Sequence, residues 1–247
     1  MVSLDGKLGL VTGAAGVLGR ALTEALTADG LRVLMVDLDA DRLEQAAQEI
    51  GERAIPLTLD VSDPAAVDRV AAQVGQAHGT VEVLINNAGL LSNNKVAETT
   101  PEEWRRLMAV NLDGAFYLSR AFLPAMTDGG WGRIVNICSL AMKTGGLTAG
   151  TAYTASKGGL AALTLSLARE AAAQGVTVNA VAPAYIRTPM VTEQLNEDQR
   201  RRLLAQIPVG RFCEAEEVAH VVSFLVAPLS GFITGEIVDI NGGLHLD

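Results

Sequence analysis

Short apolar segments alternate with helical segments along the whole chain, and this alternation limits the possible folds more than any other feature. The apolar segments read as strands at 8–13, 32–38, 54–61, 81–89, the run that ends at Ser139, 176–183 and 236–242. Most are apolar throughout, as strands covered by helices on both faces must be. Alternating strands and helices are typical of a parallel sheet with helices on both faces. We therefore expect an α/β fold.

A glycine-rich turn, TGAAGVLG at residues 12–19, joins the first predicted strand to the first predicted helix. In that context Gly13 permits a tight turn, Gly16 lets the backbone approach a pyrophosphate, and Gly19 allows close helix–strand packing. The N–H groups at the start of the helix would then face the phosphates. The sequence thus predicts a dinucleotide site, although an ordinary strand-to-helix turn stays open.

The second predicted strand ends in an acidic residue, Asp37, which lies 18 residues after Gly19. A carboxylate at this place can accept both hydroxyls of an adenosine ribose and would repel a 2′-phosphate. Leu38 and Asp39 follow, so no adjacent arginine compensates for the acid. We expect NAD(H) to be preferred over NADP(H). The alternative is that Asp37 only caps the next helix.

A candidate catalytic group lies in the middle of the chain. Ser139 ends an apolar strand, and Tyr153 and Lys157 follow four residues apart. On a helix such residues share one face, and a neighbouring ammonium favours ionisation of a phenol. The group therefore fits general acid–base chemistry. A helix that carries Tyr and Lys by chance, after a serine that caps the strand, is the alternative.

Composition limits the class of protein. A chain of 247 residues fits a single domain, 1–247, and its net charge of −9 argues against nucleic-acid or anionic-membrane partners. Arg200, Arg201 and Arg202 are expected on a solvated helix face. The histidines, at 78, 220 and 245, are far apart in the sequence, and the two cysteines have no metal-binding spacing, so we expect no metal.

The expected location is the cytoplasm. The N-terminal residues lack a basic and then apolar leader, and no apolar run approaches the roughly 20 residues that span a bilayer. Cys138 precedes Ser139 in the predicted strand and is expected to point into the core.

With these stretches in view, the sequence resembles the short-chain dehydrogenase/reductase family, in its compact branch, from Lys7 to Gly243. The matching pieces are the glycine loop, Asp60 with Val61, NNAG at 86–89, Asn111, Ser139, YTASK at 153–157, PAYIRTP at 183–189 and ITGEIVDINGG at 233–243. The resemblance implies one doubly wound Rossmann-type domain with a seven-stranded parallel sheet in the order 3-2-1-4-5-6-7.

The resemblance also implies catalytic roles. Tyr153 would exchange a proton with the substrate oxygen during hydride transfer, and Ser139 would bind that oxygen. Lys157 would hold the nicotinamide ribose and lower the pKa of Tyr153. Asn111 resembles the asparagine that positions a water molecule behind the lysine.

Further positions would bind the cofactor by the same resemblance. They are Gly13, Gly16, Val17, Leu18, Gly19, Asp37, Leu38, Asp60, Val61, Asn87, Ala88, Gly89, Tyr153, Lys157, Pro183, Ile186 and Thr188. Two positions depart from the family pattern. Val17 stands where the compact branch usually has glycine, which leaves the path of the loop open, and Ala184 replaces a glycine after Pro183.

We therefore expect an NAD(H)-dependent oxidoreductase that interconverts a secondary alcohol and a ketone. Polar residues in the expected substrate loops, 140–152 and 184–207 with 91–95, favour a polyol, sugar or sugar acid. These residues are Asn93, Asn94, Lys95 and Lys143, and each lysine could equally face solvent. Two alternatives are a 3-oxoacyl-thioester (acyl-carrier-protein) reductase and a non-catalytic dinucleotide sensor. Relatives of this size imply a homo-oligomer, with a tetramer favoured, through the helix at 112–126 and the segment 218–240.

Overall fold

The computed structural model describes residues 3–188 and 197–246. Its centre is a sheet of seven strands, all parallel, in the order β3-β2-β1-β4-β5-β6-β7. The strands are β1 (Leu8–Thr12), β2 (Arg32–Asp37), β3 (Ala54–Thr58), β4 (Val81–Asn86), β5 (Gly132–Ile137), β6 (Val176–Pro183) and β7 (Ile237–Ile240). The expected fold class and strand order are confirmed.

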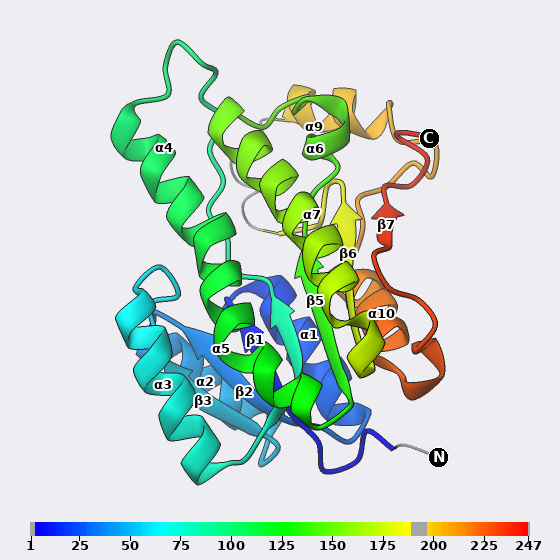
Figure 1. Ribbon diagram of the computed structural model, residues 1–247. Coiled ribbons are helices and arrows are strands. Elements are labelled where there is room, and N and C mark those ends of the chain that lie inside the picture. The colour runs from blue at the N-terminus through cyan, green and yellow to red at the C-terminus, as the bar shows by residue number, and fades with distance from the viewer. Residues whose placement is uncertain (1–2, 189–196, 247) are drawn as a thin grey trace.

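Helices cover both faces of this sheet (Figure 1). The α-helices are α1 (Val17–Ala28), α2 (Ala40–Ile50), α3 (Pro64–Ala77), α4 (Pro101–Met108), α5 (Gly114–Asp128), α6 (Ala141–Thr144), α7 (Thr151–Ala171), α9 (Glu197–Leu204) and α10 (Ala215–Val226). Short 3₁₀ turns lie at Ala172–Gln174 and Pro228–Ser230. Each helical layer buries an apolar stripe against the sheet.

The two layers form two separate apolar cores. Leu22 of α1, Leu43 of α2 and Val222 of α10 pack against one face of the sheet. Residues of α3, α5 and α7 pack against the other face. Burying one such leucine contributes about 2 kcal/mol, so the sheet is held from both sides.

Acidic and hydroxyl residues start several helices as their sequence suggests. The side chains of Asp39, Asp63 and Thr100 accept backbone N–H groups at the starts of α2, α3 and α4. Strand β3 ends at Thr58, three residues earlier than expected. Asp60 accepts hydrogen bonds from the N–H and hydroxyl of Ser62 instead, which turns the chain toward α3.

A π-helical turn interrupts the long helical segment near residue 111. Residues Ala109–Asp113 form this turn between α4 and α5, and Figure 1 shows the three pieces as one continuous rod. A π-helical turn inside an α-helix is rare and occurs often at functional sites. It places Asn111 in the interior, where the side chain is 1% exposed.

Within residues 3–188 and 197–246, no helix combines the length and the apolar character that crossing a membrane requires.

Candidate active site

A cleft of about 570 Å³ opens at the carboxyl ends of the strands. It is lined by the residues that follow β1, β2, β4, β5 and β6 and by the start of α7. In open α/β sheets ligands bind at this edge, and a cleft of this volume is the usual size for a small-molecule site.

The glycine loop forms one end of the cleft. Gly13 has a φ of 64°, in the left-handed region that favours glycine. A Cβ atom on Gly19 would lie 2.1 Å from the carbonyl oxygen of Gly13, so no larger residue fits there. Helix α1 begins beside the loop without a side-chain cap and without an acidic residue in its first turn. These features fit the diphosphate of a dinucleotide. Its oxygens would accept hydrogen bonds from the N–H groups at the start of α1.

Asp37 lies beside this loop at the end of β2. Its carboxylate accepts the N–H of Ala15 at 3.0 Å and the N–H of Leu38 at 2.8 Å, and the residue lines the cleft. The cap of α2 is Asp39 rather than Asp37. The alternative that Asp37 only caps that helix is therefore wrong.

Most of the predicted cofactor positions line the cleft. These are Gly13, Gly16, Val17, Leu18, Gly19, Asp37, Asn87, Ala88, Gly89, Tyr153, Lys157, Pro183, Ile186 and Thr188. The lining does not include three others. Leu38 is 64% exposed, Asp60 holds the turn before α3, and Val61 is buried against Gly114. Direct contact of these three residues with a cofactor stays a prediction.

Ser139, Tyr153 and Lys157 come together in the middle of the cleft. The Ser139 hydroxyl and the Tyr153 phenol share a hydrogen bond. The Lys157 Nζ atom donates to the carbonyl oxygen of Ile137 at 2.7 Å and lies 5.9 Å from the centroid of the tyrosine ring. Helix α7 thus presents tyrosine and lysine on one face, toward the end of β5.

Burial dominates the ionisation of this group. Desolvation raises the pKa of Tyr153, and the hydrogen bond from Ser139 opposes it only in part. Desolvation also lowers the pKa of Lys157, which is 4% exposed. Lys157 is not among the groups that shift the pKa of Tyr153 here, so its lowering of that pKa stays a prediction. Cys138 points into the core as expected, and burial raises its pKa to about 11.

Asn111 does not line the cleft, but it bonds to two segments that do. Its amide nitrogen donates to the carbonyl of Leu90 at 2.9 Å and to the Ser156 hydroxyl at 3.0 Å. Its amide oxygen accepts the N–H of Leu90 at 2.8 Å. The side chain therefore fixes the segment after β4 to α7, and its part in a water relay stays a prediction.

The part of the cleft expected to hold the substrate is rich in leucine, with Asn93, Thr144 and Thr148 as polar residues among the lining. It is lined by Leu90, Leu91, Leu140, Leu147, Tyr185 and Leu244. The Nζ atom of Lys143 donates instead to Asp239 of β7 at 2.7 Å. The Nζ atom of Lys95 donates to the carbonyl oxygens of Gly146 and Ala149. Neither lysine lines the cleft: Lys95 holds the loop before α7, and Lys143 of α6 is bound to β7. Of the four residues expected to form a polar wall, Asn93 alone is among the lining residues. Residues 189–196 of the expected substrate segment 184–207 lie outside the described residues.

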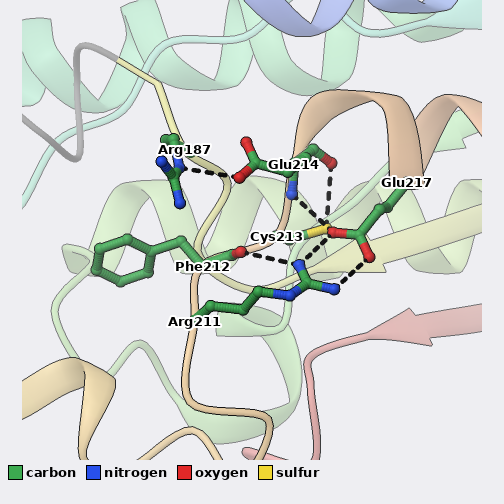
Figure 2. A network of polar contacts seen from close by, with 6 residues as sticks. All are labelled: Arg187, Arg211, Phe212, Cys213, Glu214 and Glu217. Carbon is green, nitrogen blue, oxygen red and sulfur yellow. Dashed lines mark hydrogen bonds and ion pairs between the residues drawn. The ribbon is translucent and has the colours of Figure 1, made fainter.

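Two ion pairs lie at the start of α10 (Figure 2). The segment of Cys213 there pairs with the cleft rim at Tyr185 and Ile186. Arg187 contacts Glu214 at 3.0 Å, and Arg211 donates two hydrogen bonds to Glu217 at 2.6 and 2.7 Å. Backbone bonds of Cys213 with Tyr185 and Arg187 join the same two segments. This rim is therefore tied to the start of α10.

Sequence reasoning missed several residues of the site. The Thr12 hydroxyl accepts the N–H groups of both Asn87 and Ala88 at 2.9 Å, which joins β1 to the segment after β4. Arg42 lines the cleft at the Asp37 end, and Leu244 lines it from the end of the chain. Thr12 opens the glycine motif, but its hydroxyl contacts lie far along the sequence. No local pattern marks Arg42 and Leu244, which reach the cleft through tertiary folding.

Comparison with known proteins gives the wider context. A family model described as enoyl-(acyl carrier protein) reductase matches residues 13–245. The protein named 3-oxoacyl-[acyl-carrier-protein] reductase FabG of Salmonella typhimurium is 39% identical over 99% of this chain and 100% of its own length. The protein of the same name from Escherichia coli is 38% identical with the same coverage.

Solved structures share the fold over the full length. A protein of Agrobacterium tumefaciens, provisionally described as a gluconate dehydrogenase, superposes with a TM-score of 0.94 at 32% identity, over 98% of this chain and 97% of its own. A short-chain dehydrogenase/reductase of Brucella melitensis, described as a glucose/ribitol dehydrogenase, gives 0.91 at 32% identity over both whole chains.

These findings correct the expected substrate and confirm the expected family. The relatives with 38–39% identity are named as reductases of 3-oxoacyl groups, and the lysines that suggested a sugar acid or polyol are engaged elsewhere. The expectation of a sugar or polyol substrate is therefore wrong. The fold, the glycine loop, the Ser–Tyr–Lys group and the matches over nearly the whole chain agree. The chain belongs to the short-chain dehydrogenase/reductase family, and is an oxidoreductase that uses a nicotinamide dinucleotide.

Proposed function

We propose that the protein reduces a 3-oxoacyl thioester to the 3-hydroxyacyl thioester. The observation that carries the proposal is the placement of Ser139, Tyr153 and Lys157 against the leucine-rich part of the cleft. An acyl chain is apolar and would pack on Leu90, Leu147 and Leu244. The relatives named as 3-oxoacyl-[acyl-carrier-protein] reductases support the same substrate class.

Each catalytic side chain has a role in this proposal. A bound nicotinamide dinucleotide supplies the hydride that reduces the carbonyl carbon. The Tyr153 phenol donates its proton to the carbonyl oxygen, and the Ser139 hydroxyl donates a hydrogen bond to that oxygen as negative charge develops. The Lys157 ammonium binds the nicotinamide ribose, and Gly13, Gly16 and Gly19 leave room for the diphosphate.

We propose NADH as the preferred reductant. The Asp37 carboxylate lies at the end of β2 beside the glycine loop, where it would accept the ribose hydroxyls and repel a 2′-phosphate. Arg42 lines the same end of the cleft, and its guanidinium would attract a 2′-phosphate. To favour NADPH, that attraction would have to exceed the repulsion from the Asp37 carboxylate, which backbone N–H groups hold in place. We also propose that the protein is located in the cytoplasm and assembles as a homotetramer.

The substrate class can be tested with purified protein. Absorbance at the reduced-nicotinamide band would follow turnover of 3-oxoacyl thioesters, on a carrier protein and on coenzyme A, with NADH and NADPH. Gluconate and polyols with the oxidised cofactors form the comparison. We expect reduction of the thioesters to exceed oxidation of the sugars by more than about 100-fold in kcat/KM, since a leucine-rich wall leaves most sugar hydroxyls unpaired. Turnover of a sugar or polyol without turnover of any thioester would refute the proposal.

A further inference from the structure

The helix that carries Tyr153 takes its cap from a distant segment. Helix α7 starts at Thr151 with Gly150 as N-cap and has no side-chain cap of its own. The N–H of Gly150 donates to the carbonyl oxygen of Ser92 at 2.7 Å, and the N–H of Thr151 donates to that of Asn94 at 3.1 Å. The first N–H groups of a helix lack partners within the helix, so residues 92–95 complete the start of α7.

The contact between this segment and the helix is close. A Cβ atom on Gly150 would lie 2.4 Å from the carbonyl oxygen of Asn94 and 2.8 Å from that of Ser92. Only glycine therefore fits between the segment and the helix. Tyr153 is three residues after Gly150, so a shift of the segment would move the first turn of α7 and with it the phenol.

Glu103 of α4 holds the capping segment in place. Its two carboxylate oxygens accept hydrogen bonds from the Ser92 hydroxyl and, at 2.9 Å, from the Asn94 amide nitrogen. These two bonds lower the pKa of Glu103, so it is ionised near neutral pH. The N–H of Glu103 is itself bound by the Thr100 hydroxyl at 3.1 Å, which fixes the start of α4. One carboxylate thus fastens both residues that cap α7.

We propose that Glu103 is a positioning residue for Tyr153, acting through Ser92 and Asn94 on the first turn of α7. The proposal rests on the proposed function only for the role of Tyr153 as proton donor. Among the described residues, Glu103 is not part of the cleft lining, whereas Asn93 of the capping segment is. Because proton transfer depends on the position of the phenol, loss of Glu103 should slow catalysis more than it weakens dinucleotide binding.

Three variants and a matched control separate positioning from folding. Glu103→Ala removes both hydrogen bonds, and Glu103→Gln keeps an oxygen for one donor only. Asn94→Ala removes one bond and leaves the backbone carbonyl that binds Thr151. Glu102→Ala is the control, because Glu102 lies on the same turn of α4 and its side chain contacts only Arg105 among the described residues.

Two measurements are made on each variant. The first is kcat and KM for thioester reduction, and the second is hydrogen–deuterium exchange of a peptide that covers residues 150–153. For Glu103→Ala we expect kcat to fall by about 10-fold or more, with KM for the dinucleotide within about twofold, as a misplaced catalytic group implies. Exchange at 150–153 should rise in the same variant. Glu103→Gln and Asn94→Ala should be intermediate, and Glu102→Ala should match the wild type.

The outcomes are distinguishable. Unchanged exchange at 150–153 in both Glu103→Ala and Asn94→Ala would overturn the proposal, whatever the activity. Faster exchange with unchanged kcat would overturn it as well, because the helix start would then be free to move without harm. The exchange measurement needs no substrate. Faster exchange in a protein that reduces no thioester would therefore overturn the proposed function, while leaving it established that Glu103 holds the start of α7 through Ser92 and Asn94.

Discussion

The phenol of Tyr153 is held in the state that reduction needs. Its pKa lies above the ordinary value, mainly because partial burial weakens solvation of the phenolate, and the hydrogen bond to Ser139 lowers it only in part. A raised pKa keeps the proton on the phenol through neutral pH. For reduction of a carbonyl the protonated form is the active one, so the electrostatics of the site match the proposed direction.

The pH dependence of reduction follows from this shift. We expect kcat/KM for thioester reduction to stay level through neutral pH and to fall only when the pH passes the ordinary tyrosine pKa of about 10. Initial rates across the pH range, with circular dichroism to confirm that the protein remains folded, would check this. A tyrosine-dependent decline that begins near pH 7 would show that Lys157 or the bound cofactor outweighs burial.

Asp37 decides between the two cofactors in our account. In Asp37→Ala, kcat/KM with NADH should fall by about 10-fold or more, because the ribose hydroxyls lose an acceptor, while that with NADPH should rise. Asp39→Ala is a matched control, since Asp39 caps α2 through the N–H of Arg42 and does not line the cleft. If the wild type already prefers NADPH, or if Asp37→Ala leaves the ratio unchanged, Asp37 does not select the cofactor.

At the scale of single elements, the start of α10 is held by a capping box and an ion pair. Glu217 accepts the N–H of Glu214 at 2.9 Å and the two bonds from Arg211. Arg211 lowers the pKa of Glu217 to about 2. A lowered pKa means that the carboxylate contributes stability above its ordinary pKa of about 4.3. That contribution is lost as the pH falls through about 2.

Replacing Glu217 tests this cap. Glu217→Ala should lower the free energy of unfolding by about 1 kcal/mol at neutral pH, the usual value of an N-terminal cap on a partly exposed site. The melting temperature should fall by about 2–4 °C. The difference from wild type should shrink as the pH is lowered below about 4. Thermal melts at several pH values measure it, with the exposed Glu216→Ala as control; equal effects of both substitutions would contradict the assignment.

The elements themselves could largely be predicted from sequence, because local signals mark them. Asp63 with Pro64 marks the start of α3, and the apolar runs mark the strands. The π-helical turn around Asn111 could not be predicted, since it depends on the hydrogen bonds of Asn111 with Leu90 and Ser156. The early end of β3 has a similar cause in Asp60.

At the scale of the whole molecule, residues distant in the sequence make the site. The Ser139–Tyr153–Lys157 group and the glycine loop could be predicted because each carries a recognisable motif. The walls could not, because Leu244 reaches the cleft from the other end of the chain and Lys143 turns toward β7. Residue type in a loop does not reveal which way a side chain points. The substrate prediction failed for this reason.

Exposed apolar side chains on the outer helices favour assembly. Phe116 of α5 and Leu165 of α7 are about half exposed, and Phe224, Leu229 and Phe232 are exposed at the end of α10 and beyond it. Exposed apolar patches on a folded chain usually mark contacts with another protein. We predict a homo-oligomer, with a tetramer favoured, and sedimentation velocity measures it. Phe232→Asp should shift the protein toward smaller species, and a wild type that sediments only as the 25.8 kDa chain would contradict the prediction.

The most direct test of the account compares hydride transfer by the wild type and by Tyr153→Phe, which differ by one hydroxyl group. A single turnover of a 3-oxoacyl thioester with NADH would be followed by stopped-flow absorbance, with dinucleotide binding measured separately by fluorescence. We predict that the rate constant falls by about 100-fold to 10,000-fold while the dinucleotide Kd stays within about twofold, as loss of a proton donor implies. A variant that reduces the thioester as fast as the wild type would show that Tyr153 is not the proton donor.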